Sequence, residues 1–374
     1  MFAGNDGHGG AVPDGVTRAV LLVAIVALAA CSSPSPVASS SPPATTPASP
    51  FAPPAASATP APSASPVATV DVAYTGLSLN CRLPVSWPVK SGQTYMYTAG
   101  FISFPTGALT VDPAAPAGSV FYDRALSRWL PVYRPAVSPD GKRYAYSEGN
   151  AFLGTAGKLH VVDVATGADR VIYSGDRVYA VVDFAADGLY LTAAAPEGRP
   201  RGLWWQDPTG GAATLISSSI ASPAVGGGAG WGADFNTADP SPGPGGLEGP
   251  MNRLLRFDLR TGTSSPWFYK PGSNLYVMGF DPVGHPLVST FVVTDPSGQG
   301  TNEIWLVVSQ TSAVAIFSGT GAAIPSRLAA LDGHGEWFDG GSQGGTVWLS
   351  VAGSTQVVAS ASIDGLLVAG GCIS

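Results

Sequence analysis

Short apolar runs separated by glycine turns repeat along most of this chain, and they predict strands rather than helices. The clearest unit spans 133–172 and reads YRPAVSPDGKRYAYSEGNAFLGTAGKLHVVDVATGADRVI. Its runs at 135–138, 143–147, 158–164 and 170–173 are apolar or rich in aromatic and β-branched residues, which favour strands. The Asp140-Gly141 pair supplies a tight turn, because glycine tolerates positive φ. Four such strands make one small antiparallel sheet that cannot stand alone and must pack against further copies.

Turn glycines indicate that this unit recurs. Their mean spacing is about 43 residues, which is the period of a four-stranded propeller blade. The first turn of each copy is assigned to Gly107, Gly141, Gly188, Gly230, Gly284, Gly333 and Gly365. We therefore expect an all-β chain folded as a β-propeller.

The two ends of the domain predict how the ring closes. Gly76 reads as the second turn of a unit that has no first half, and Gly365 as the first turn of a unit that has no second half. Joining them gives one composite blade built from N- and C-terminal strands, which leaves no half-blade exposed. This count favours seven four-stranded blades, with six as the alternative.

The segments VSPDGKRYAYS and LHVVDVATGADRVI resemble the TolB-like, WD40-like propeller repeat of bacterial extracytoplasmic proteins. The resemblance implies a β-propeller, but that fold hosts both binding scaffolds and enzymes. The first hypothesis is a binding or scaffold module for a protein, peptide or glycan. The alternative is a propeller enzyme, a lyase or hydrolase acting at the central channel. Histidine is scarce in this chain, which disfavours the enzyme.

Composition excludes few partners. Charged residues make up 11% of the chain and the formal net charge is −7, so no basic face for nucleic acid is expected.

Gly340–Gly344 matches the G-x-S-x-G motif of serine hydrolases, but a glycine-rich loop and a strand follow it instead of the required helix. His285 and His334 follow first-turn glycines and lack ligand spacing. We expect no cofactor, no metal, no catalytic constellation and a monomer.

The first 69 residues read as an export signal followed by a linker. Residues 1–31 resemble a lipoprotein signal peptide, in which a short apolar run ends in Leu28-Ala29-Ala30-Cys31. The resemblance implies lipidation of Cys31 and anchoring to the outer face of the cell membrane. Residues 32–69 are almost entirely Ser, Pro, Ala, Thr and Val, and read as a disordered tether. The propeller domain is assigned to 70–374.

Two further cysteines, Cys81 and Cys372, lie in the terminal segments that the composite blade would pair. An exported protein tolerates disulfides, so we expect a bond between them. Two buried free thiols are the alternative.

Long loops are expected on one rim of the ring, because the connections from second to third strands all emerge on one face. The long ones are Glu148–Gly157, Ala193–Arg201, Phe235–Asn252 and Val292–Glu303. We predict a mixed-charge binding collar there, with Trp231 as an apolar anchor. Its residues are Glu197, Arg199, Arg201, Trp231, Asp234, Asn236, Glu248, Asn252, Asp295 and Glu303. Solvated loops without a partner are the alternative.

Overall fold

The computed structural model describes residues 68–72, 77–91, 94–150, 155–193, 201–234, 251–293, 300–320, 324–340 and 345–374, without the side chains of Arg201, Ser219 and Val293. The chain divides into two compact units, Met1–Pro60 and Ala61–Ser374. Every described residue belongs to the second unit. None of the described residues forms a helix long and apolar enough to cross a membrane.

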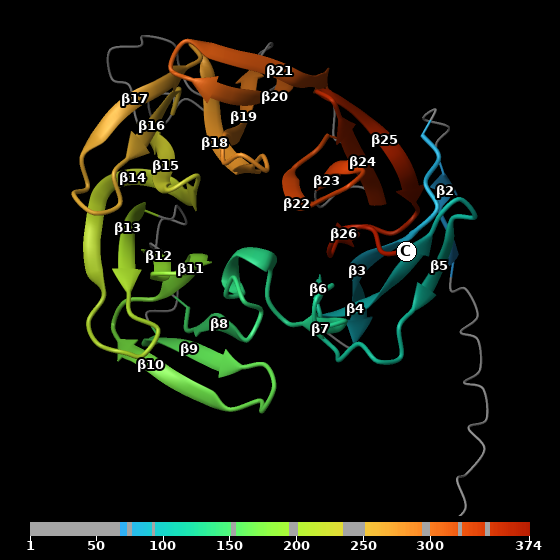
Figure 1. The fold of residues 1–374 in the computed structure, drawn as a ribbon, viewed down its shortest axis with the longest axis horizontal. Coiled ribbons are helices and arrows are strands. Elements are labelled where there is room, and N and C mark those ends of the chain that lie inside the picture. Colours follow the sequence, from blue (N-terminus) through green and yellow to red (C-terminus); the bar gives the residue numbers. More distant parts are fainter. Residues whose placement is uncertain are drawn as a thin grey trace, which may run out of the picture. The chain divides into compact units, whose positions relative to one another are not determined.

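The second unit is a β-propeller of six blades, the smaller of the two counts considered above. Each blade is antiparallel, and its strands step outward from a central channel (Figure 1). Blade two has the fewest strands of the six blades, namely β8 (Arg143–Glu148), β9 (Gly157–Asp163) and β10 (Asp169–Gly175). The Asp140-Gly141 turn precedes β8, and Gly167 joins β9 to β10, as the repeat predicts.

The next four blades follow the chain in order. Blade three holds β11 (Tyr179–Ala185), β12 (Gly188–Ala193), β13 (Arg201–Gln206) and the first half of β14 (Thr214–Gly226). Blade four holds the second half of β14, β15 (Ala229–Asp234), β16 (Arg253–Phe257) and β17 (Ser264–Tyr269). Blade five holds β18 (Ser273–Phe280), β19 (Pro286–Val293), β20 (Gly300–Ser309) and β21 (Ser312–Thr320). Blade six holds β22 (Arg327–Asp332), β23 (Gly335–Asp339), β24 (Gly345–Val351) and β25 (Ser354–Ala361).

Strand β14 is shared between two blades. Its first residues pair with β13, and Ala221–Gly226 pairs with β15, so blades three and four form one seven-stranded sheet. The strand turns from the outer edge of one blade to the inner edge of the next near Ser222, whose φ is +47°. Positive φ is uncommon for a residue with a Cβ and marks a sharp change of direction.

Blade one combines both ends of the domain, as predicted. Its inner strand is the C-terminal β26 (Leu367–Val368), which pairs with β3 (Arg82–Ser91). The sheet then continues through β4 (Thr94–Ser103), β5 (Ala108–Val111) and β1 (Ala68–Thr69). The short β2 (Asp71–Val72) crosses to the outer edge of blade six, where it pairs with β25. The ring is therefore closed from both termini.

The preference for seven blades came from counting one blade twice. Gly107 lies between β4 and β5 and has a φ of +71°, so it is the outer hairpin turn of blade one. The repeat count takes Gly107 instead as the first turn of a separate blade, which adds one blade to the ring. Gly230 was also misplaced, because it lies inside β15, while Gly227 and Gly228 form the turn that precedes this strand.

Apolar side chains fill the junctions between blades. At the closure, Leu83, Val85 and Ile102 of blade one pack in one cluster with Trp337 and Leu349 of blade six. All five are less than 1% exposed. Burying a side chain of this size stabilises the fold by about 1.5–3 kcal/mol, so the closure does not depend on its short strands alone.

The junction between blades one and two differs from the others. A separate hairpin, β6 (Phe121–Asp123) and β7 (Arg128–Leu130), lies between the two sheets (Figure 1). Leu130 of this hairpin packs with Val164 of blade two, and Arg128 Nη1 donates to the Val164 carbonyl. The hairpin therefore bridges the two blades.

Candidate functional site

Blade two lacks a regular inner strand. The segment before β8 instead forms one turn of 3-10 helix, η1 (Arg134–Ala136), followed by a single bridge between Val137 and Tyr144. Pro135 explains the interruption, because proline has no N–H to donate to a neighbouring strand. The strand predicted at 135–138 is therefore wrong, apart from the single bridge at Val137.

A large cavity occupies the channel beside this irregular segment. Its volume is about 1080 Å³, at the upper end of the range for ligand pockets, about 300–1,000 Å³. The walls are η1, part of β8 and the inner strands of blades three to six, namely β11, β14, β18 and β22. Most side chains that line it are alanine, valine and other apolar residues.

A few charged groups of both signs interrupt the apolar wall. Arg134 and Asp183 line the cavity, and Arg134 Nη1 donates to the Val137 carbonyl at 2.9 Å. On the blade-six side, Arg327 forms an ion pair of 2.5 Å with the buried Asp339 and its guanidinium lies over the ring of Tyr133. Neither sign dominates the cavity.

Asp183 is the most perturbed carboxyl of the cavity. Burial raises its pKa from an ordinary 3.8 to about 6, assisted by the negative charge of Asp187 and opposed by Arg134. The folded state therefore binds this proton more tightly than the unfolded state does. The resulting stability is fully present below about pH 4 and is lost as the pH rises through about 6.

We expect Asp183→Asn to remove most of this pH dependence. Between pH 4 and pH 7 the wild-type free energy of unfolding should fall by up to about 3 kcal/mol more than that of the variant, because one pKa unit is worth about 1.4 kcal/mol. Urea unfolding at a series of pH values measures the difference. Asp364→Asn is the control, since it removes an exposed carboxyl that does not line the cavity. Parallel pH profiles for wild type and Asp183→Asn would contradict the assignment.

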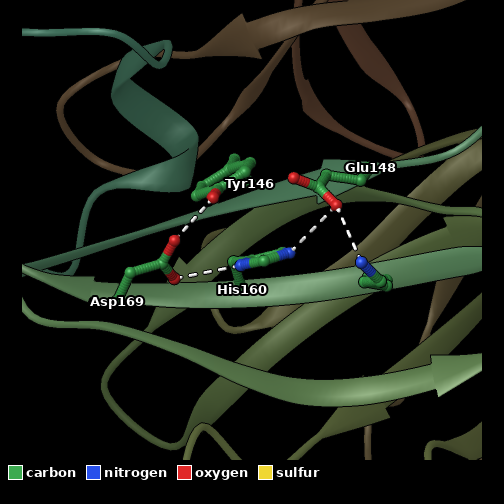
Figure 2. Close-up of polar contacts among 5 residues, drawn as sticks. Tyr146, Glu148, His160 and Asp169 are labelled. Carbon is green, nitrogen blue, oxygen red and sulfur yellow. Dashed lines mark hydrogen bonds and ion pairs between the residues drawn. The ribbon is translucent and has the colours of Figure 1, made fainter.

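A second group of polar residues, the polar cluster of blade two, lies on the face of that blade turned away from blade three. It consists of Tyr146, Glu148, Lys158, His160 and Asp169 (Figure 2). Asp169 accepts a hydrogen bond of 2.7 Å from the Tyr146 hydroxyl, and its other oxygen lies 3.0 Å from His160 Nδ1. Glu148 lies 3.5 Å from His160 Nε2 and 3.4 Å from Lys158 Nζ. The rings of Tyr146 and His160 stack at 4.5 Å.

Strand register brings these residues together. Tyr146 pairs with His160, and Glu148 with Lys158, across the β8–β9 ladder. Directly opposed side chains on one face of a sheet lie about 5 Å apart, which allows the rings to stack. Burial and the hydrogen bond to Asp169 raise the pKa of Tyr146. The hydrogen bonds from Tyr146 and His160 lower the pKa of the Asp169 carboxyl.

The cluster is suited to ordering the blade. Asp169 holds His160 through Nδ1, as the orienting carboxylate of a general base does, but the group nearest Nε2 is the carboxylate of Glu148. Nε2 is itself buried and has no hydrogen-bond partner within the described part of the chain. A nucleophile–base pair requires a hydroxyl or thiol within about 3 Å, so this geometry favours a structural network over acyl-transfer chemistry.

The predicted rim collar lies largely outside the described residues. The structure does not describe Glu197, Arg199, Asn236, Glu248, Asp295 or the side chain of Arg201. Cys31, the predicted lipidation site, also lies outside the described residues. Of the rest, Trp231 is 3% exposed and donates Nε1 to the Gly226 carbonyl, so it packs inside the ring and is not a surface anchor. Asn252 is buried as well.

The remaining two collar residues make ion pairs. Asp234 binds Arg253 through both carboxylate oxygens, at 2.9 and 2.6 Å. Glu303 lies 2.8 Å from Lys270 Nζ and accepts a hydrogen bond from Trp305 Nε1. Burial opposes ionisation of Glu303, but these two contacts outweigh it and lower the pKa of the carboxyl.

The expected disulfide between Cys81 and Cys372 is present, with 5.7 Å between the α-carbons. His334 lies near both sulfurs, but bonded sulfurs are not the free thiolates that a metal ion requires. Instead, Asp332 accepts hydrogen bonds from His334 N, Trp337 Nε1 and Cys372 N. The carboxylate of Asp332 thus ties the C-terminal segment to blade six, a role that the sequence did not reveal.

In blade five, His285 likewise binds an aspartate of its own turn. Its Nδ1 lies 2.9 Å from Asp281, which also accepts hydrogen bonds from His285 N and Val283 N. Both turn histidines therefore bind an aspartate of their own turn. The signal in the sequence is an aspartate two or four residues before each histidine.

No protein-family model matches this chain, and no curated protein matches it. Among solved structures, TolB from Acinetobacter baumannii has a TM-score of 0.43 and 15% identity, over 79% of this chain and 69% of TolB. A prolyl endopeptidase structure has a TM-score of 0.45 and 12% identity, over 76% of this chain and 50% of the other. An oligogalacturonate lyase in complex with manganese has a TM-score of 0.43 and 13% identity, over 71% of both chains. The structural neighbours of this chain thus include TolB and other propeller proteins, and the likeness is one of fold.

Proposed function

We propose that this protein is an exported, lipid-anchored propeller that binds a peptide segment of a partner protein in its central cavity. The observation that supports this most directly is the cavity of about 1080 Å³ beside the irregular inner segment of blade two. Its wall is apolar with isolated charges of both signs, as a peptide ligand requires. A strongly anionic polymer would need many more basic groups than Arg134 and Arg327, the two arginines that line this wall.

We expect Ala180→Trp to block the cavity. Ala180 is exposed and lines the cavity from β11, so the indole should occupy ligand space without disturbing the core. The probe is a peptide selected from displayed random linear peptides of about twelve residues on the full-length chain. Its affinity, measured by calorimetry, should fall by at least about tenfold.

Ala114→Trp is the matched control for this substitution. Ala114 is also exposed, but it lies outside the cavity, and peptide affinity should stay unchanged there. If no peptide is selected, or if Ala180→Trp binds the selected peptide as tightly as wild type, binding in the cavity is wrong.

The anchor forms a separate part of the proposal. It rests on the lipobox-like Leu28-Ala29-Ala30-Cys31 after a short apolar run. Cys31→Ala should release the protein from membranes, because stable anchoring needs attached acyl chains that the variant cannot carry. Membrane fractionation of wild type and variant measures this, with Ser33→Ala, two residues further along, as the control. A variant that remains fully in the membrane fraction would exclude lipidation at Cys31 as the anchor.

A further inference from the structure

The missing inner strand of blade two leaves the inner edge of β8 beyond Tyr144 without a neighbouring strand in the described part of the chain. In the β8–β9 ladder, Val164 N donates to the Lys142 carbonyl, which sets the alternation of hydrogen-bonded pairs. Since such pairs recur at every second residue, Tyr144, Tyr146 and Glu148 direct their backbone groups toward β9. Ala145 and Ser147 must direct theirs toward the opposite, inner edge.

The start of β8 confirms this direction. The Arg143 carbonyl accepts a hydrogen bond from Ser138 N, and Arg143 N donates one to Ser138 Oγ. Arg143 lies two residues before Ala145 and four before Ser147, so the backbone groups of all three point to the same edge of β8. The preceding segment pairs with the inner edge of β8 through the bridge between Val137 and Tyr144, which directs the Ala145 N–H toward the Ala136 carbonyl. Beyond it, Ala145 and Ser147 line the cavity, with η1 on the other side of that space.

This part of β8 also carries an orphaned polar atom. Ser147 Oγ is buried and has no hydrogen-bond partner among the described residues. A buried hydroxyl without a partner costs about 1–3 kcal/mol, so a ligand that supplies one gains affinity there. Unpaired backbone N–H and C=O groups on a strand edge are the usual template for an added strand.

We propose that the peptide ligand of the cavity binds as an added β-strand along the inner edge of β8, through the Ala145 carbonyl and the N–H and carbonyl groups of Ser147. This inference rests on the proposed peptide-binding function and names its recognition mode. The ligand is an extended segment with small or apolar side chains, because alanine and valine side chains line the cavity beside this edge. Its N–H groups facing β8 must be free, so proline is excluded at alternate positions.

A partner protein is a better occupant than this chain's own N-terminal segment. Residues 32–67 carry eleven prolines, among them the pairs Pro42-Pro43 and Pro53-Pro54. Proline has no N–H and is confined to strand positions that need no donor. A segment so rich in proline makes a poor donor strand.

Ser147→Pro tests the edge directly. It removes an N–H that points into the cavity and leaves the β9 ladder intact, and it should weaken binding of the selected peptide by at least about tenfold. Val171→Pro is the matched control. Val171 lies on β10 at the outer edge of the same sheet, is 47% exposed, and should leave affinity within about twofold of wild type.

Two measurements on the wild-type chain keep the test decisive if Ser147→Pro does not fold. The amide hydrogen of Ser147 should exchange rapidly in the free protein and become protected when the peptide binds. Methylation of the peptide backbone nitrogens one at a time should abolish binding at every second position. A peptide that is blocked by Ala180→Trp, yet shows no alternation and no protection of the Ser147 amide, would overturn strand addition while leaving the cavity as its site. Insensitivity to Ala180→Trp would overturn the proposed function itself.

Discussion

Replacing Cys81 and Cys372 together by serine should lower the free energy of unfolding by about 3–5 kcal/mol. The bond joins residues separated by 291 positions, and the chain-entropy model gives about 6 kcal/mol for a loop of this length, although native disulfides usually deliver less. Part of the closure survives, because Arg82 and Ile373 still exchange backbone hydrogen bonds of 2.7 and 2.9 Å. Guanidinium unfolding of wild type and double variant, with and without reductant, measures the loss.

Reductant supplies the internal control for this experiment. It should lower the stability of wild type toward that of the double variant and leave the double variant unchanged. A loss below about 1 kcal/mol would show that apolar packing and strand pairing hold the ring closed without the covalent bond.

Asp332→Ala should cost about 3 kcal/mol or more. The carboxylate is 1% exposed, and its removal leaves the N–H groups of His334, Cys372 and Trp337 without their acceptor. A buried donor without a partner costs about 1–3 kcal/mol, and three such donors add to one another only in part. Urea unfolding at constant pH measures the change in the free energy of unfolding.

Asp281→Ala is the matched control in blade five. Among the described residues, the Asp281 carboxylate accepts hydrogen bonds from Val283 and His285 of its own turn. Its loss should cost less, about 1 kcal/mol, because the Asp281 side chain is 12% exposed, against 1% for Asp332, and water can reach the donors that it leaves. Equal losses in the two variants would mean that the contacts of Asp332 to Trp337 and Cys372 do not stabilise the closure.

The fold class could be predicted because its signals are local. Gly141, Gly167 and Gly188 occupy turns at the positions that the repeat assigns to them, each with positive φ. The blade number depends instead on which sheet a strand joins, and Gly107 looks like any other turn glycine in the sequence. Only the pairing of β26 with β3 shows that this turn belongs to the composite blade.

The candidate site was harder to predict, since it depends on contacts between strands and on an interruption. His160 is buried within β9, but its partner Asp169 comes from the next strand and its ring partner Tyr146 from the previous one. Pro135 was the available signal for the missing inner strand, because it cannot donate to β8. The rim residues were chosen for charge, yet Asp234 and Glu303 already bind Arg253 and Lys270.

The continuous strand β14 has a consequence for how this ring could have changed during evolution. Propellers built of separate blades can gain or lose one blade by duplication or deletion at any junction. Here the strand that completes blade three also begins blade four, with Ala221 paired to both β13 and β15. A duplication or deletion that ended there would leave half a strand on each side, so only the junctions bounded by separate strands permit exchange of whole blades.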